Sequence, residues 1–252
     1  MSIKYIRGLY YCVSIVLLMP TGMCSWYFNY KPSTVNVTSA DIQEQSPLVT
    51  LLLVPAGDAR NQGRSLEHQF ESSSAHAYAR SLKTAIEKIN PVVRVLVSHK
   101  PGEIVQPFQV PTMANTLAVD LVITINCYRE LGPKPALYLY QFSYGAEFIS
   151  KLSECAWNSI DNAYLFAKAT TGLWAAAFVN ACKSDDYTSI FTVHGPYKLP
   201  FKPLIGIKVP ALGLEMSILQ DDDWTTLINP IVAACEQLFN PIIKQRSQME
   251  VV

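Results

Sequence analysis

Apolar residues along this chain fall into short continuous runs, separated by segments with helical spacing. The run 48–54, LVTLLLV, is rich in branched side chains, which is typical of a strand covered on both faces. Over 72–90 apolar residues recur at helical spacing, with Ser72 or Ser73 as the expected N-cap and Pro91 ending the helix. The same patterns predict strands over 92–98, 121–128, 136–143, 203–208 and 211–219, and helices over 110–118, 154–183 (one or two) and 225–245, the last interrupted or bent at Pro230 and Pro241.

The order of these elements indicates the fold class. From 48 to 128 the chain alternates strand, helix, strand, helix, strand, which favours parallel strands joined by right-handed crossovers. We therefore predict an α/β domain over 47–245, built in three layers, with a mostly parallel central sheet flanked by helices.

The N-terminal segment has the form of an export signal. Lys4 and Arg7 precede the apolar stretch 9–19, which Pro20 ends. This stretch of about eleven residues is too short to span a bilayer and suits the core of a secretory signal. We expect a signal peptide or an N-terminal anchor over 1–25 and a polar linker over 26–46. The protein is then exported to the periplasm or cell envelope, and it touches the membrane only through the leader, if the leader is not cleaved.

Charge and cysteine content exclude several classes of partner and site. The 20 basic side chains balance the 20 acidic ones, so no long-range field attracts nucleic acid. Four cysteines fall in the predicted domain, without any CxxC pair, and read as buried hydrophobes or as partners in a disulfide outside the cytoplasm: Cys127, Cys155, Cys182 and Cys235. The glycines of the loop 55–64 belong to neither a GxGxxG nor a GK[ST] motif, which argues against nucleotide binding, and no GxSxG elbow is present.

Four fragments, in order, resemble the zinc-dependent N-acetylmuramoyl-L-alanine amidases of the autolysin type, which cut the bond between muramic acid and the peptide stem of the bacterial cell wall. The strand 210–216, PALGLEM, is similar to the strand that carries the family's catalytic glutamate, here Glu215. Glu71 has the spacing from Leu82 that is expected of a ligand glutamate. The stretch 113–125 follows the family's "AN…ADLFISI" pattern, which includes Asn115, and 95–99 lies where "VVLTR" is usual.

The chain departs from the family at the metal site. Asn126 stands where a second ligand histidine is expected, and an amide oxygen is a poorer zinc donor than imidazole. The first histidine is replaced by Gly57, or by Asp58 if the loop has one extra residue. The resemblance thus implies a zinc site made of Glu71, Asp58 and Asn126, with His68 as a substitute ligand to consider. The other histidines are expected on a helix flank (His76), a strand end (His99) and the surface (His194).

Two functions follow from the resemblance. In the first, the domain hydrolyses the muramoyl-alanine amide of peptidoglycan with Glu215 as general base, and Arg64 and Asn115 bind substrate. In the second, the domain has lost its metal and is not catalytic, and it binds wall peptide or a partner protein in the cleft that corresponds to the family's active site. Structural interpretations stand beside both: Glu71 is stabilised by the amides of a helix N-terminus, and Glu215 pairs with Arg60 or Arg64.

Overall fold

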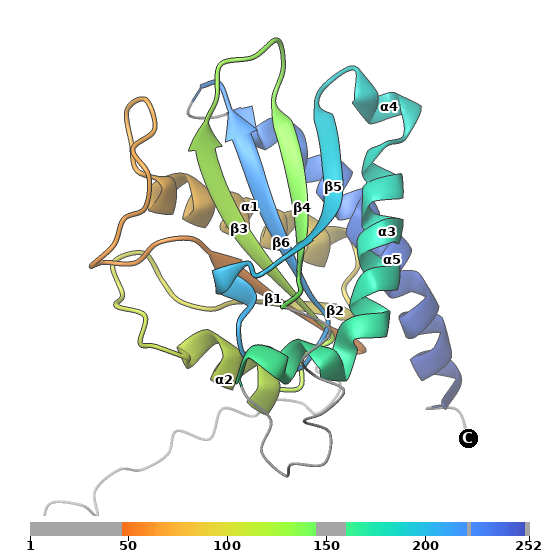
Figure 1. Cartoon of the computed structure of the whole chain (residues 1–252). Coiled ribbons are helices and arrows are strands. Elements are labelled where there is room, and N and C mark those ends of the chain that lie inside the picture. Colours follow the sequence, from red (N-terminus) through yellow and green to blue (C-terminus); the bar gives the residue numbers. More distant parts are fainter. Residues whose placement is uncertain (1–46, 145–159, 221–222, 250–252) are drawn as a thin grey trace, which may run out of the picture. The chain divides into compact units, whose positions relative to one another are not determined.

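A computed structural model describes residues 47–144, 160–220 and 223–249 (Figure 1). The leader predicted over 1–25, the linker predicted over 26–46 and Cys155 lie outside the described residues. None of the described helices is long and apolar enough to cross a bilayer.

Six strands form one mixed sheet in the order β2-β1-β3-β6-β4-β5. Neighbours β2, β1, β3 and β6 are parallel, whereas β4 is antiparallel to β6 and parallel to β5. The strands are β1 (Val49–Pro55), β2 (Val93–Val97), β3 (Leu121–Arg129), β4 (Ala136–Phe142), β5 (Thr192–Leu199) and β6 (Ala211–Ile218). The predicted three-layer α/β fold with a mostly parallel sheet is therefore confirmed.

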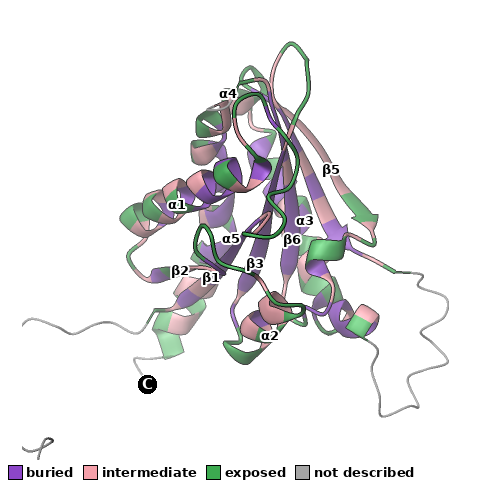
Figure 2. Cartoon of the chain, turned by 90° about the vertical axis from the view of Figure 1, so that its left-hand side faces the viewer, coloured by how far each residue is buried: buried purple, intermediate pink, exposed green. Residues whose placement is uncertain are grey.

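Helices cover both faces of the sheet, because the central strands are apolar on both sides. The helices α1 (Glu71–Ile89), α3 (Lys168–Cys182) and α5 (Ile228–Met249) pack on one face over the larger core. The opposite face carries α2 (Gln109–Thr116) and the 3-10 helices η2 (Ile160–Ala167) and η3 (Lys202–Leu204) over a smaller core. Figure 2 shows the buried residues concentrated in the strands and on the inner sides of the helices. Two short helices, α4 (Asp185–Thr188) and η4 (Asp223–Leu227), complete the described elements.

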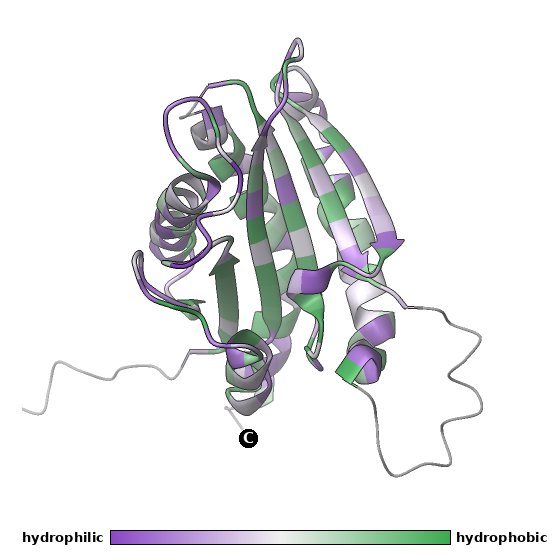
Figure 3. Ribbon diagram, turned by 60° about the vertical axis from the view of Figure 1, so that its left-hand side comes forward, coloured by the Kyte–Doolittle hydropathy of each residue, from purple (hydrophilic) through white to green (hydrophobic). Residues whose placement is uncertain are grey.

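The smaller core leaves part of its face open. It reaches Val54 and Val122 on the central strands but not the carboxyl ends of β3 and β6. Hydrophilic positions interrupt the hydrophobic central strands there (Figure 3). Polar residues of this face, at the ends of β3 and β6, are thus left for a site.

Several local predictions need correction. The strand predicted over 203–208 is wrong, because η3 and a loop occupy this segment, and the strand before it, β5, was not predicted. Neither Ser72 nor Ser73 is the N-cap of α1: the cap is Phe70, and Glu71 is the first helical residue. The closing helix continues through Pro241 to Met249.

The described cysteines are buried and unpaired. Cys127, Cys182 and Cys235 each have a free thiol. They act as small hydrophobes within the larger core.

Candidate functional site

Glu215 lies in the middle of β6 and points to the open face of the sheet. It is paired in register with Asn126 of β3 and with Tyr138 of β4. Register partners on neighbouring strands project to the same side, about 4.8 Å apart. The structure therefore places Glu215 and Asn126 side by side on this face.

Arg64, from the loop between β1 and α1, carries the positive charge of this site. Its Nη2 donates a hydrogen bond of 2.6 Å to Glu215 Oε1, and its Nε lies 3.9 Å from Glu71 Oε2. The carboxylates are well covered, with side-chain exposures of 15% for Glu215 and 6% for Glu71, while the arginine side chain is half exposed. One guanidinium therefore lies between two carboxylates that come from distant parts of the chain.

Glu71 accepts hydrogen bonds both from the loop between β1 and α1 and from strand β3. Its Oε1 accepts a hydrogen bond of 3.0 Å from the backbone N–H of Cys127, and its Oε2 accepts one of 3.1 Å from the N–H of Arg64. Gly63 passes so close that an added Cβ would stand 2.7 Å from Glu71 Oε2, and its φ of 78° suits glycine. Both oxygens of Glu71 are thus engaged by backbone amides.

Two tyrosines complete the surroundings of Arg64 and Glu215. Tyr140 donates its hydroxyl hydrogen to Glu215 Oε2 at 2.7 Å, and the Tyr128 ring lies 5.4 Å from the Arg64 guanidinium carbon. Burial, followed by the hydrogen bond to Glu215, raises the pKa of Tyr140, so its hydroxyl stays protonated and remains a donor. Burial lowers the pKa of Arg64, but the hydrogen bond and charge of Glu215 and the charge of Glu71 outweigh it and raise this pKa overall.

Asp58 organises its own loop. Its carboxylate accepts hydrogen bonds from the backbone N–H groups of Arg60, Asn61 and Val105, at 2.9, 2.6 and 3.0 Å. The bond from Asn61, followed by the one from Val105, lowers the pKa of Asp58. This carboxylate is therefore an anchor for the loop.

Asn126 is 9% exposed, and its side-chain amide nitrogen donates hydrogen bonds to groups of the central sheet. Its Nδ2 donates to the Leu214 carbonyl at 3.2 Å and to Thr124 Oγ1 at 3.5 Å. The amide oxygen, Oδ1, has no hydrogen-bond donor within the described residues.

The zinc implied by the sequence resemblance does not fit these donors. A zinc site needs about three protein ligands, mostly nitrogen or sulfur. Within residues 47–144, 160–220 and 223–249, no group of three histidine, cysteine, aspartate or glutamate side chains could hold a metal ion. The carboxylate oxygens of Glu71, Asp58 and Glu215 already accept hydrogen bonds, and the cation between Glu71 and Glu215 is the guanidinium of Arg64.

Asn115 and the histidines have other surroundings. The Asn115 amide donates to the Gly206 carbonyl at 2.9 Å and accepts from the Lys208 N–H at 2.8 Å, so it joins α2 to the segment before β6. His76 and His99 are buried and pack edge to face, with ring centroids 4.7 Å apart. His194 stacks on Tyr138.

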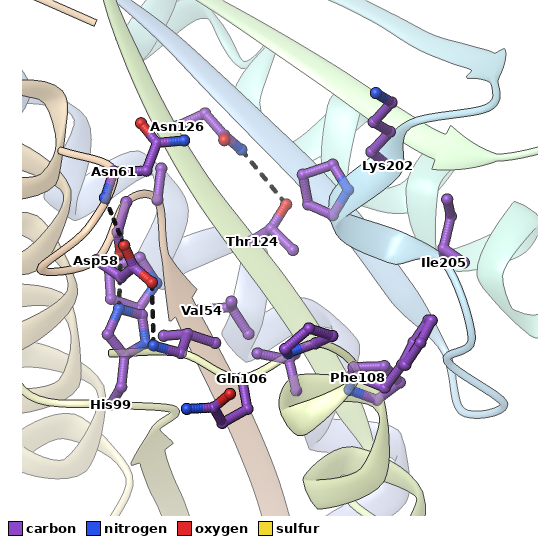
Figure 4. A pocket seen from close by; sticks show the side chains of 18 residues that line it. Val54, Asp58, Asn61, His99, Gln106, Phe108, Thr124, Asn126, Lys202 and Ile205 are labelled. Carbon is purple, nitrogen blue, oxygen red and sulfur yellow. Dashed lines mark hydrogen bonds between the residues drawn. The ribbon is translucent and has the colours of Figure 1, made fainter. Parts of the chain in front are cut away.

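A cavity of about 470 Å³ lies beside the arginine cluster, which consists of Arg64, Glu71 and Glu215 (Figure 4). It opens at the carboxyl end of β1 and over the middle of β3, and the loop that holds Asp58 forms part of its wall. Asp58 and Asn126 line it, whereas Arg64, Glu71 and Glu215 do not. The predicted site residues thus fall into two adjacent groups, Arg64 with Glu71 and Glu215, and Asp58 with Asn126 at the cavity, while Asn115 belongs to neither.

Sequence reasoning missed Tyr140 and the residues of the cavity mouth. The alternation in ALYLYQF places Tyr138 and Tyr140 on one face, which was the available signal. It does not reveal which strand lies next to β4. For Phe108 and Gln106 in the loop before α2, the sequence carries no periodic signal.

No protein-family model and no curated protein sequence matches the chain. Among solved structures, it is similar to the N-acetylmuramoyl-L-alanine amidase of Nostoc punctiforme, at 11% identity and a TM-score of 0.53, covering 77% of this chain and 99% of that one. It is also similar to the apo form of the N-acetylmuramyl-L-alanine amidase of Mycobacterium abscessus, at 9% identity and a TM-score of 0.50, covering 76% and 98%. The described domain therefore has the fold of N-acetylmuramoyl-L-alanine amidase catalytic domains.

Proposed function

We propose that this chain is a non-catalytic relative of the wall amidases, which binds peptidoglycan or its muropeptides in the cleft at the carboxyl ends of the strands. The observation that carries the proposal is the position of Arg64, 2.6 Å from Glu215 and 3.9 Å from Glu71. The fold supports an amidase-like domain, and the arginine replaces the cation on which the family's chemistry depends.

The state of Glu215 supports binding over hydrolysis. A general base must reach the proton that it removes at hydrogen-bond distance. Here Arg64 donates to one oxygen of Glu215 and Tyr140 donates to the other, at 2.6 and 2.7 Å. Glu215 therefore serves as a fixed acceptor that holds Arg64 and Tyr140 in place beside the cavity.

The proposed location follows from the proposed ligand. Peptidoglycan lies outside the inner membrane, and the leader predicted over 1–25 brings the domain to the periplasm or cell envelope. The linker predicted over 26–46 separates the leader from the domain over 47–245.

Sedimentation with insoluble peptidoglycan tests the proposal. The full chain should sediment with the wall to the same extent in EDTA and in zinc, and mass spectrometry should find no released stem peptide. Arg64→Met should reduce the bound fraction, because the half-exposed arginine lies beside the cavity, while Arg94→Met, a matched change of an exposed arginine on β2, should not.

Two results would contradict the proposal. Zinc-dependent release of stem peptide that is lost in Glu215→Gln would establish the hydrolase instead. Absence of sedimentation under every condition would remove peptidoglycan as the ligand.

A further inference from the structure

The end of the domain at which the parallel strands begin, here called the basal end, lies opposite to the end at which they finish. The topology fixes which segments reach it: α1 ends where β2 begins, α2 ends where β3 begins, and Lys208 comes just before β6. The helix α5 also ends there, because Arg246 donates hydrogen bonds to the Leu48 carbonyl and to Asp120. In Figure 1, α2 and the end of α5 lie at the basal end, opposite to α4.

Exposed charges are divided unevenly between the two ends. Exposed lysines lie at the basal end: Lys88, Lys168, Lys208 and Lys244. The exposed carboxylates of the described residues lie at the other end: Glu67, Glu103, Glu130, Asp185 and Asp186. The acids at the basal end are only partly exposed, and they are Asp120, which pairs with Arg246, Glu87, which pairs with Lys83, and Asp161. The basal end is therefore locally positive, although basic and acidic residues balance over the whole chain.

Exposed apolar side chains lie among these lysines. Leu117, which follows α2, is 51% exposed, and Ile160 and Phe166 of η2 are 41% and 62% exposed. Single exposed apolar residues are ordinary, but a group of them marks an interaction surface. We call these three residues, together with Lys168 and Lys208, the basal patch.

The elements that carry the basal patch are packed together. The ammonium of Lys208 lies 5.4 Å from the centre of the Phe166 ring, so a positive charge stands beside an exposed aromatic side chain. Asn115 of α2 bonds to the Gly206 carbonyl and to the Lys208 N–H. Gly206 in turn lies against Ile160, because a Cβ added to it would stand 3.0 Å from that side chain. The patch is therefore one surface formed by α2, η2 and the segment before β6.

The composition of the basal patch fits an anionic lipid surface better than a protein partner. Lysine is depleted in protein interfaces relative to the rest of the surface. At a membrane surface, lysine stems lie along apolar groups while their ammonium groups reach the lipid phosphates, and aromatic and aliphatic side chains enter between the headgroups. Each lysine near an anionic leaflet adds to the attraction.

The chain also enters the domain at the basal end. The first strand begins at Val49, directly after the linker predicted over 26–46 and the leader predicted over 1–25. The covalent connection to a membrane leader is therefore on the same side of the domain as the basal patch.

We propose that the basal patch docks the domain on an anionic lipid bilayer. Its apolar side chains enter between the headgroups, and Lys168 and Lys208 contact the lipid phosphates. This contact goes beyond the proposed wall binding, does not depend on it, and is additional to any contact made by the leader. The carboxyl ends of the parallel strands, where the proposed cleft lies, then face away from the membrane.

Hydrogen exchange of the full chain, measured by mass spectrometry, tests the docking. Vesicles of phosphatidylglycerol and phosphatidylcholine in equal parts are compared with vesicles of phosphatidylcholine alone. The amides of 160–168 and 204–209 should exchange about threefold or more slowly on the anionic vesicles, and 1 M salt should remove much of this difference. The amides of 129–135, at the opposite end, should exchange equally on both. Because the readout is local, binding through the leader alone would leave all of these segments unprotected.

Charge reversal tests the role of the lysines. Lys168→Glu combined with Lys208→Glu should abolish the slower exchange on anionic vesicles, because lipid phosphates then repel the patch. Lys100→Glu combined with Lys183→Glu reverses two exposed lysines at the opposite end and should leave the slower exchange intact.

A second pair of variants tests the apolar contact. Phe166→Ser should reduce the slowing of exchange by about half or more, because the ring no longer enters the bilayer surface. Leu131→Ser changes a residue that is 84% exposed at the opposite end and should have no effect on it. Since both side chains are exposed, both variants should keep the melting temperature of the parent.

Three results would overturn the proposal: 160–168 exchanges equally on both kinds of vesicle, the protection appears at 129–135 instead, or Lys168→Glu with Lys208→Glu leaves it intact. Heparin, a soluble polyanion, is the control for polymer binding. If it protects the same segments as strongly as anionic vesicles do, the surface belongs to an anionic polymer and not to lipid. Sedimentation with peptidoglycan tests the wall binding separately, so that either proposal can fail alone.

Discussion

Replacing Arg64 by methionine tests the electrostatic arrangement of the cleft. Methionine keeps much of the length of the arginine side chain and its apolar stem but removes the charge. Glu215 and Glu71 then lie close together, with exposures of 15% and 6%, without a cation between them. We expect the variant to fold with a lower free energy of unfolding.

The size of the expected loss in the free energy of unfolding follows from the distances between Arg64 and the two carboxylates. At an effective dielectric constant of about 20, two unit charges about 4 Å apart attract by roughly 4 kcal/mol. Half of the arginine side chain is exposed, so water screens part of this energy, and the desolvation of both ions opposes the rest. We expect a loss of about 2 kcal/mol in Arg64→Met, and a smaller loss in 1 M salt.

Urea unfolding at neutral pH measures this loss. Arg94→Met, on the exposed side of β2, is the matched control and should change stability by less than about 0.5 kcal/mol. A double-mutant cycle of Arg64→Met with Glu215→Gln should give a coupling energy of about 1–2 kcal/mol. A coupling energy near zero, with Arg64→Met as stable as the parent, would refute the arrangement.

Three further substitutions test other parts of the account. Burial, followed by the charges of His99 and Arg80, lowers the pKa of His76 from 6.5 to about 4. Between these pH values the unfolded state binds more protons than the folded state, so the free energy of unfolding of the parent should fall by up to about 3 kcal/mol more than that of His76→Leu between pH 7 and pH 4. An equal fall for parent and variant in urea unfolding would contradict the lowered pKa. Gly63→Ala should lower stability by about 1–3 kcal/mol, because φ is 78° and the new Cβ would meet Glu71; an unchanged melting temperature would contradict the close approach. Asn115→Ala should cost about 1–2 kcal/mol, because two backbone groups, at Gly206 and Lys208, lose their partner, and unaltered thermal unfolding would argue against this link.

The parallel part of the sheet was predictable because its strands are continuous apolar runs. The structure pairs Asn126 of β3 with Glu215 of β6 in register, which apolar runs alone do not specify. The direction of β4 was not predictable, because alternation of Tyr and Leu carries no information on orientation. The edge strand β5 escaped prediction because Gly195 and Pro196 interrupt its pattern.

The chemistry of the site was only partly readable from the sequence. Glu71 was singled out through the resemblance to the amidases, and Glu215 through that resemblance and its place as an acid within an apolar run. Arg64 was considered as a partner of Glu215, but its position between two carboxylates depends on a contact across 151 residues, made from a loop without any periodic pattern. Asp58 has the residue type of a ligand, and only the structure shows that backbone amides occupy its carboxylate.

Calorimetric titration of zinc into the full chain tests the central claim most directly, namely that Arg64 is the cation of this cleft. The account predicts that the parent protein shows no stoichiometric zinc binding attributable to Glu71 and Glu215, and that its melting temperature is the same in EDTA and in zinc. Tight binding of one zinc per chain that is lost in Glu71→Gln would contradict it.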